Sequence, residues 1–349
     1  MREIVINLES DYDAIGDFLD DKKIERIMIV HRGTYENLFI KEYVVNSICA
    51  ASKTIVHFSD YETNPTYDSV QKGVNVCNEN NIQCIIAVGG GSTIDVAKGI
   101  KYYSNNRNDI CQIAIPTTAG SGSEATHFAV IYRNQVKESL ADKSLLPDIS
   151  VLDSNNIGNL PKYQRLSTGL DAFCHCVESM WAKGATDESM SYASEALGRI
   201  IINYDGYVKG DKECSKEMLI AANLAGKAIN ISKTTAAHAM SYKLSALLHI
   251  SHGHAAALCL EQVWKMMLKR GKNESVVEVL SSIDAANDIS TLEWLTNTLN
   301  INGLRIVDSS VNADVIDELV KNVNVERLSN HPMDITQIQL TEMYKAILG

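Results

Sequence analysis

Basic residues and long apolar runs are both scarce in this sequence. The 349 residues include 32 Lys and Arg against 43 Asp and Glu, a formal net charge of −11. Nucleic-acid and anionic membrane surfaces need clustered Lys and Arg, so this deficit argues against both as partners. No run approaches the roughly 18 apolar residues that span a bilayer. The N-terminal stretch lacks the apolar core of a signal peptide, which predicts a cytoplasmic protein.

Closely spaced cysteine pairs and prolines are scarce too. Among the eight cysteines none forms a C-x-x-C pair, and they stand at Cys49, Cys77, Cys84, Cys111, Cys174, Cys176, Cys214 and Cys259. In a chain of this length without a secretion signal, we expect them as reduced core thiols. There are only five prolines, and Pro161 lies just after the sequence changes in character.

Short apolar runs alternate with amphipathic stretches through the first 155 residues. Five runs are typical of buried strands, at 24–31, 54–60, 83–91, 111–118 and 149–153. Strands that alternate with helical patterns predict a parallel sheet covered on both faces. After about residue 155 the strand-like runs stop and helix-period segments follow. We therefore expect an α/β domain over 1–155 and an all-α domain over 156–349.

A glycine-rich turn, AVGGGSTIDVAKG, joins a predicted strand to a predicted helix. Glycines let the backbone approach a pyrophosphate, and the free N–H groups at a helix start attract its negative charge. Hydroxyl side chains follow directly and add donors. The turn thus predicts a dinucleotide site at Gly89, Gly90, Gly91, Ser92 and Thr93. The alternative is an ordinary tight turn.

A second loop of the same kind, PTTAGSGSEAT, follows the next predicted strand. It contributes Thr117 and Thr118 at a carboxyl strand end, where open α/β sheets bind their ligands. Two such loops on neighbouring strands would flank one phosphate-bearing ligand.

Candidate metal ligands lie in the helical half of the chain. Asp171 and His175 are four residues apart in GLDAFCHCVE, on one side of a predicted helix. His238 and His252 follow in a second apolar, small-residue stretch. One carboxylate and three imidazoles suit Fe(II) or Zn(II) better than Mg(II) or Ca(II). Glu178 shares the helix face of Asp171 and could orient a ligand; the alternative is that each histidine is structural.

Taken together, these segments resemble the iron-containing alcohol dehydrogenases. The resemblance is collinear over most of the chain and includes the GGGS turn, PTTAGSGSE, LPDISVLD, GLDAFCHCVE, HGHA and RLSNHPMDIT. It implies a dinucleotide-binding domain over 1–155 and a helical metal- and substrate-binding domain over 156–349, in an architecture like that of dehydroquinate synthase. It also implies a homodimer.

The resemblance assigns roles to particular residues. It implies that the metal, Fe²⁺ with Zn²⁺ as the alternative, is held by Asp171, His175, His238 and His252. It implies that the two glycine- and threonine-containing loops contact NAD(P)H. In such an enzyme the ion polarises an aldehyde oxygen as a Lewis acid while the nicotinamide supplies a hydride.

One position departs from the family pattern. Many members carry a further histidine four residues after the third ligand, and here that residue is Tyr242. A tyrosine can donate a hydrogen bond, but a free tyrosine side chain ionises only near a pKa of 10. We therefore expect Tyr242 to take part in catalysis with a different proton route or substrate contact.

The triplet Lys233, Thr234 and Thr235 precedes His238 by about one helical turn. A lysine, hydroxyl groups and a helix N-terminus together make a compact anion site. This stretch also resembles the phosphonoacetaldehyde reductases, which implies reduction of phosphonoacetaldehyde to 2-hydroxyethylphosphonate and a place in phosphonate biosynthesis. The alternative is that Ser232 or Thr234 only caps the helix.

The coenzyme and the reaction class leave further alternatives. The strand 24–31 ends in His31 and Arg32, where NAD-preferring relatives often carry an acidic residue; a basic residue tolerates a 2′-phosphate and favours NADPH. Alternatively, Arg32 simply faces solvent. The competing functions are a general short-chain alcohol or lactaldehyde dehydrogenase, a lyase similar to dehydroquinate synthase, and a non-catalytic dinucleotide-binding protein.

Overall fold

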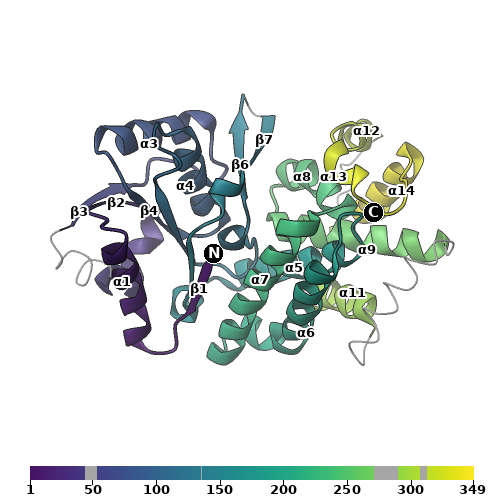
Figure 1. Ribbon diagram of the computed structural model, residues 1–349. Helices are drawn as coiled ribbons and strands as arrows, with labels where there is room; N and C mark the ends of the chain where they lie inside the picture. The colour runs from purple at the N-terminus through teal and green to yellow at the C-terminus, as the bar shows by residue number, and fades with distance from the viewer. Residues whose placement is uncertain (44–52, 135, 271–289, 307–312) are drawn as a thin grey trace. The chain divides into compact units, whose positions relative to one another are not determined.

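The structure, a computed structural model, describes every residue except 44–52, 135, 271–289 and 307–312. The chain forms two units. The first comprises Met1–Leu160 with Lys209–Gly226, and the second comprises Pro161–Val208 with Lys227–Gly349. Figure 1 labels helices and strands of both units.

A six-stranded parallel sheet forms the centre of the first unit (Figure 1). Its order is β1-β8-β5-β4-β2-β3, so β4 lies between β2 and β5. The strands are β1 (Arg2–Val5), β2 (Arg26–His31), β3 (Thr54–Phe58), β4 (Cys84–Gly89), β5 (Cys111–Pro116) and β8 (Ile149–Leu152). The five strands expected from the apolar runs are all present, and the expectation of a parallel sheet is confirmed.

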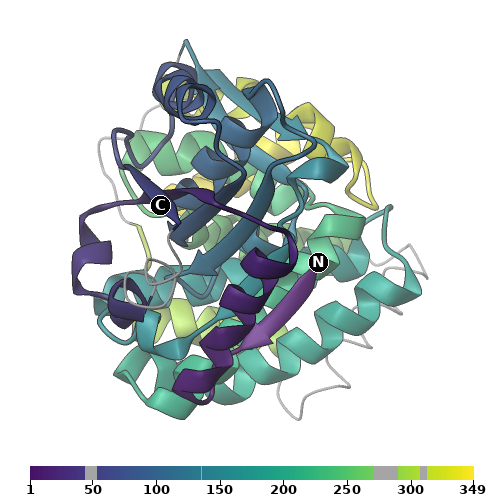
Figure 2. The same cartoon turned by 60° about the vertical axis from the view of Figure 1, so that its left-hand side comes forward.

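Helices cover both faces of this sheet. Along β4, Ile85 and Ala87 pack in one core with residues of α3 and α4, while Ile86 and Val88 pack in another with residues of α1. Figure 2 shows α1 in front of the sheet beside the N-terminal strand. The helices of this unit are α1 (Asp13–Asp21), α2 (Phe39–Tyr43), α3 (Tyr67–Glu79) and α4 (Gly91–Tyr103), with short 3-10 helices at Glu9–Tyr12, Gly33–Asn37, Ser123–Ala125, Lys143–Leu145 and Ser154–Ile157.

Three strands were not expected from the sequence. The edge strand β1 has two exposed residues among four, and it pairs with β8 alone. The other two form an antiparallel hairpin of β6 (Phe128–Arg133) and β7 (Val136–Ala141). Strand β7 buries one residue of six, whereas β6, FAVIYR, has a short apolar run that was not predicted as a strand. Strands β1 and β7, which bury so little, lack the apolar runs of the predicted strands.

The segment Lys209–Gly226 departs from a single boundary near residue 155. It includes most of α7 (Lys212–Ser232), which packs with the sheet. The side chain of Asn223 donates to Glu124 Oε1 at 3.3 Å and to Ser150 Oγ at 3.2 Å. A Cβ on Gly226 would lie 2.6 Å from the carbonyl oxygen of Gly122, so only glycine allows this close approach.

The second unit is built from helices, as expected. They are α5 (Lys162–Trp181), α6 (Asp187–Lys209), α7, α8 (Ala236–Leu248), α9 (His252–Arg270), α11 (Thr291–Ile301), α12 (Ala313–Lys321), α13 (Val325–Ser329) and α14 (Gln337–Leu348). Helix α5 is buried on nearly every side, which is typical of a central helix. Within the described residues, no helix combines the length and apolar character needed to cross a membrane.

The described cysteines carry free thiols, as expected. Five of them are buried, and Cys111 and Cys214 are half-buried. Cys49 lies outside the described residues.

A buried lysine ties the loop after β5 to helix α4. Lys98 is fully buried, and its ammonium donates to the backbone carbonyls of Ser123 at 2.6 Å, Thr126 at 2.7 Å and Phe128 at 2.9 Å. One turn earlier, Asp95 accepts a hydrogen bond from Ser123 Oγ at 2.7 Å. Burial lowers the pKa of Lys98 to about 8, against the attraction of Asp95. These contacts fix the second glycine- and threonine-rich loop.

Replacing Lys98 should therefore destabilise the protein strongly. In Lys98→Met, two buried carbonyl groups and one part-buried carbonyl group lose their donor, and we expect a loss of roughly 3 kcal/mol or more in the free energy of unfolding. Urea unfolding followed by circular dichroism measures it. The control is Lys72→Met, whose exposed ion pair with Asp60 should contribute less than about 1 kcal/mol. Equal midpoints for the two variants would contradict the anchoring role of Lys98.

Candidate active site

Helix α5 carries three candidate residues on one buried side. Asp171, His175 and Glu178 follow at spacings of four and three residues, which align them along a helix. Their exposed fractions are 7%, 5% and 0%. His238 lies in the first turn of α8, and His252 is the first residue of α9. Three helices thus contribute candidate residues, which are buried except for the half-buried His252.

A glycine permits the close approach of α9 to α5. A Cβ on Gly253 would lie 2.1 Å from the carbonyl oxygen of Ser167 and 2.6 Å from the Cβ of Asp171. Any other residue would push the two helices apart. Gly253 therefore allows His252, its neighbour in the chain, to lie beside Asp171.

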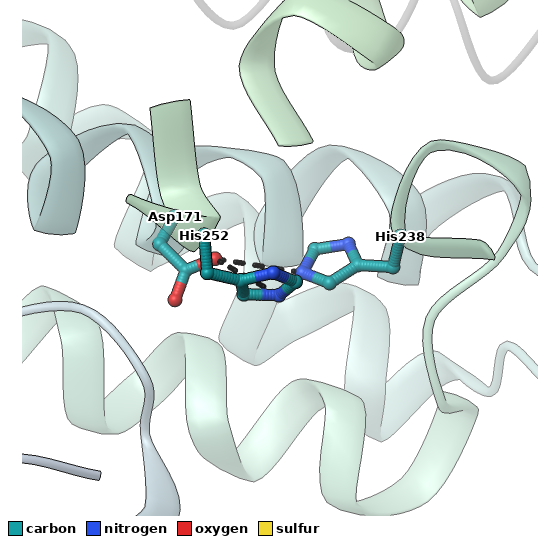
Figure 3. A group of neighbouring side chains, drawn as sticks. All are labelled: Asp171, His238 and His252. Carbon is teal, nitrogen blue, oxygen red and sulfur yellow. Dashed lines mark ion pairs between the residues drawn. The ribbon is translucent and has the colours of Figure 1, made fainter. Parts of the chain in front are cut away.

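Asp171, His238 and His252 converge on one point (Figure 3). Asp171 Oδ1 lies 3.5 Å from His238 Nε2 and 3.9 Å from His252 Nε2, and one ligand atom from each of the three lies within 4.8 Å of the others. The side chain of His252 is 40% exposed, whereas those of Asp171 and His238 are 10% and 3% exposed. The group is therefore open to solvent chiefly on the side of His252.

This arrangement fits a bound cation. Asp171 Oδ1 and His238 Nε2 are buried, and within the described part of the chain neither atom has a hydrogen-bond partner. Their 3.5 Å separation is longer than a good hydrogen bond, so the two lone pairs face each other across a small space. Buried polar atoms without partners are costly, and a metal ion that accepted both lone pairs would satisfy them.

The carboxylate of Glu178 orients His238 and caps its helix. Glu178 Oε1 accepts hydrogen bonds from the N–H groups of Thr235 at 3.0 Å and Ala237 at 2.9 Å, and from the hydroxyl of Thr235 at 2.6 Å. Glu178 Oε2 bonds to His238 Nδ1. Because Nδ1 is held in this way, the lone pair of Nε2 remains available on the side of Asp171.

Two buried carboxylates make this cluster strongly attractive to positive charge. Burial by itself lowers the pKa of His238, but the attraction of Glu178 and the closeness of both carboxylates raise it to about 10. Burial raises the pKa of Asp171, yet the nearby histidines, His175 first, hold it below its usual range. A proton or a metal cation is therefore favoured between Asp171 and Glu178.

The remaining aromatic rings lie around this group. His175 is not among the three converging side chains; its ring lies against that of His238, with centroids 4.7 Å apart and planes at 19°. The ring of Tyr242 stacks on His252 with centroids 5.3 Å apart and planes at 7°. His254, two residues after His252, bonds to Tyr163 OH at 3.0 Å through Nδ1.

The triplet before α8 is only partly open to a ligand. The ammonium of Lys233 lies 3.2 Å from Glu326 Oε1, and both side chains are exposed. The hydroxyl of Thr235 donates to Glu178 and accepts from Trp181 Nε1 at 2.9 Å. Thr234 is buried. An anion from solvent would therefore meet the charge of Lys233, because Thr234 is buried and the hydroxyl of Thr235 is already bonded.

Neither Ser232 nor Thr234, the two residues predicted to cap α8, is its N-cap residue. The N-cap residue of α8 is Thr235, which makes no side-chain capping bond. The hydroxyl of Ser232 instead bonds to Ser179 Oγ at 2.8 Å. Since the cap comes from Glu178 on another helix, local sequence could not reveal it.

The glycine-rich turn joins β4 to α4 in the first unit. Gly90 is the N-cap residue of α4 and has no side chain with which to cap the helix. A Cβ on Gly91 would lie 2.8 Å from Ser121 Oγ, and one on Gly90 would lie 3.3 Å from the side chain of Thr118. The N–H of Thr117 donates to the carbonyl oxygen of Gly89 at 3.1 Å. The two loops named from the sequence thus lie side by side at the carboxyl ends of β4 and β5.

Some hydroxyl groups of this turn are already engaged. Tyr61 OH donates to Thr93 Oγ1 at 2.9 Å, and Ser92 Oγ bonds to the carbonyl oxygen of Thr63. Arg32, exposed after β2, donates to Thr63 Oγ1 at 3.0 Å. The polar stretch after β3 therefore connects the ends of β2 and β4.

Three residues that shape these sites were not predicted from the sequence: Tyr61, Thr63 and Gly253. Tyr61 and Thr63 follow β3, the neighbour of β2, so their position after a predicted strand was a usable signal. For Gly253 the signal was a glycine directly after a candidate ligand, but its packing partner on α5 is distant in sequence.

Comparison with known proteins covers both units. Residues 4–154 match iron-containing alcohol dehydrogenase, and residues 165–348 match the C-terminal part of the Fe-containing alcohol dehydrogenase family. The chain is 25% identical to NADPH-dependent butanol dehydrogenase of Clostridium saccharobutylicum over 92% of this chain and 91% of that protein. It is 31% identical to aldehyde-alcohol dehydrogenase 2 of Entamoeba histolytica over 69% of this chain, but spans only 31% of that longer protein.

Solved structures share the fold over nearly the whole chain. The iron-containing alcohol dehydrogenase of Thermococcus thioreducens superposes with a TM-score of 0.90 at 21% identity, covering 99% of this chain and 98% of that one. Sulfoacetaldehyde reductase of Bifidobacterium kashiwanohense, in complex with NAD+, gives 0.86 at 23% identity, covering 99% and 96%. Because the family models match nearly the whole chain, the chain belongs to the iron-containing alcohol dehydrogenase family. It is an oxidoreductase that acts on CH–OH groups.

Proposed function

We propose that the chain reduces a short aldehyde with NADPH at a divalent metal ion held by Asp171, His175, His238 and His252. The observation that carries this proposal is the buried pair Asp171 Oδ1 and His238 Nε2, whose lone pairs face each other beside His252. His175 lies one turn from Asp171 on the same side of α5 and is the fourth proposed ligand. Imidazole and carboxylate ligands suit Fe²⁺, and they also suit Zn²⁺.

The side chains around the proposed metal ion suit the reduction of a carbonyl group. When bound, the ion supplies Lewis-acid polarisation of an aldehyde oxygen. Glu178 keeps a proton on Nδ1 of His238, so that Nε2 is the ligating atom. Burial of Asp171 and His238 excludes water from one side, while the partly exposed His252 leaves the other side for substrate.

The first unit supplies the coenzyme loops. Nicotinamide coenzymes provide a hydride. The uncapped start of α4 at Gly90 offers N–H groups to a pyrophosphate, and a Cβ on Gly91 would meet Ser121, which explains the need for glycine there. Thr117 and Thr118 flank the same turn.

Arg32 supports NADPH as the coenzyme. Its guanidinium is exposed after the end of β2 and is hydrogen-bonded to Thr63. It can therefore pair with a 2′-phosphate without a change of side-chain position. One relative matched over most of its length is an NADPH-dependent butanol dehydrogenase.

Within this class, we propose phosphonoacetaldehyde as the substrate. The exposed ammonium of Lys233 precedes the helix that carries His238, and an anionic substituent could replace Glu326 as the partner of Lys233. A structural relative that reduces sulfoacetaldehyde also handles a two-carbon aldehyde with an anionic group. The alternative is a general short-chain alcohol dehydrogenase, which is favoured by the engagement of Thr235 and of the first N–H groups of α8 by Glu178.

Removing the carboxylate of Glu178 should weaken metal binding. In Glu178→Gln the side chain can no longer accept bonds at both oxygens, so His238 loses its fixed orientation, and we expect roughly a 10- to 100-fold lower metal affinity. Chelator competition on anaerobically loaded protein measures it. The matched control is Glu195→Gln, at an exposed ion pair of α6, which should bind metal like the wild type. Equal affinity for both variants would remove Glu178 from the site.

Replacing Arg32 should change coenzyme preference. Loss of a charge-assisted phosphate contact in Arg32→Gln should lower kcat/KM for NADPH roughly tenfold or more and leave NADH nearly unaffected. Initial rates with each coenzyme measure the ratio. Arg107→Gln, another exposed arginine of the same unit, is the control. An unchanged ratio would show that Arg32 only faces solvent.

The substrate proposal is tested by cofactor oxidation with a set of aldehydes. We expect Fe²⁺-loaded protein to prefer phosphonoacetaldehyde over acetaldehyde, propionaldehyde and lactaldehyde, because only phosphonoacetaldehyde pairs with Lys233. Lys233→Ala should raise KM for phosphonoacetaldehyde roughly tenfold or more. Lys243→Ala, which removes another lysine ion-paired to a glutamate, should not. Equal or better turnover of the uncharged aldehydes by the wild type would establish the general alcohol dehydrogenase instead.

A further inference from the structure

Two rings from α8 contact the imidazole of His252. Tyr242 lies four residues after His238, so the two side chains project from the same side of α8. The ring of Tyr242 is nearly parallel to that of His252, with centroids 5.3 Å apart and planes at 7°. The ring of His238 meets His252 edge-on, with centroids 5.2 Å apart and planes at 65°.

His252 is the converging side chain most in need of such support. Its side chain is 40% exposed, against 10% for Asp171 and 3% for His238. As the first residue of α9, it has no preceding helical turn to restrict its rotamer. An exposed side chain must lose conformational freedom when it binds a ligand, and this loss weakens binding.

The other converging histidine is held differently. Glu178 bonds to Nδ1 of His238 and fixes that ring by a hydrogen bond. Parallel, offset aromatic rings at 4.5 to 7 Å attract each other and resist rotation of either ring. The flat face of Tyr242 thus restricts the ring of His252, as the carboxylate of Glu178 restricts that of His238.

We propose that Tyr242 is a positioning residue, whose aromatic ring rather than its hydroxyl holds His252 in the orientation that binds metal. This inference rests on the proposed function only in taking His252 as a ligand. It differs from the catalytic role expected from the sequence, because it rests on the contact between the face of the Tyr242 ring and His252.

Two substitutions separate the ring from the hydroxyl. Tyr242→Phe keeps the stacked ring and removes the oxygen, while Tyr242→Leu keeps an apolar side chain and removes the ring. Affinity for Fe²⁺ and for Co²⁺ is measured by chelator competition without substrate or coenzyme, and the Co²⁺ absorption spectrum reports the ligand geometry. We expect the Phe variant to stay within about twofold of the wild type and the Leu variant to bind roughly five- to tenfold more weakly.

Controls and kinetics complete the test. Tyr192→Leu removes a half-buried tyrosine of α6 and should leave metal affinity unchanged. If Tyr242→Leu is destabilised, thermal unfolding shows it, and the Phe variant alone still separates hydroxyl from ring. With metal bound, the Phe variant should keep the kcat and the pH profile of the wild type.

Several results would overturn the inference. A Phe variant that binds metal as weakly as the Leu variant would assign the effect to the hydroxyl. A Phe variant with normal affinity, but with a large loss of kcat and a missing limb of the pH profile, would make Tyr242 a proton-transferring residue. Wild-type affinity in the Leu variant would show that the stack positions nothing. Wild-type protein that binds neither ion would instead overturn the proposed metal site itself.

Discussion

One buried carboxylate, that of Glu178, holds the helical unit together at its functional centre. Its two oxygens receive the first N–H groups of α8, the hydroxyl of Thr235 and the imidazole of His238. A fully buried ion without such partners would cost several kcal/mol. The helix start therefore stabilises the charge, and the charge caps the helix. A bond from α5 thus sets both the position of α8 and the orientation of His238, a proposed metal ligand.

This arrangement limits what the neighbouring triplet can do. A helix N-terminus attracts one anion, and at α8 that anion is already Glu178. An anionic substrate would therefore depend on the ammonium of Lys233, which is exposed and ion-paired with exposed Glu326. In the first unit the opposite case holds, because α4 begins at Gly90 without a side-chain cap and its turn is open to a pyrophosphate. A helix N-terminus thus binds a carboxylate of the protein at α8 and is free of a side-chain cap at α4.

The sequence predicted those parts of the fold that bury apolar surface. The five predicted strands have apolar runs and the helical second unit has helix-period patterns, whereas β1 and β7 bury little and have neither. Spacing along α5 placed Asp171, His175 and Glu178 on one side of one helix. Spacing could not show that Glu178 caps α8, that Lys98 anchors the loop after β5, or that Gly253 admits α9 against α5. Each depends on a partner that is distant in the chain.

The balance of charge around His238 argues for a divalent ion rather than a proton alone. Asp171 and Glu178 are both buried, and the pKa of each is held below its usual range. When His238 is protonated, two negative charges face one positive charge in a poorly hydrated place, and one negative charge remains uncompensated. A divalent cation in place of that proton leaves His238 neutral and balances both carboxylates. It also satisfies Asp171 Oδ1 and His238 Nε2, which have no hydrogen-bond partner among the described residues. The buried electrostatics and the unpaired atoms therefore point to the same occupant.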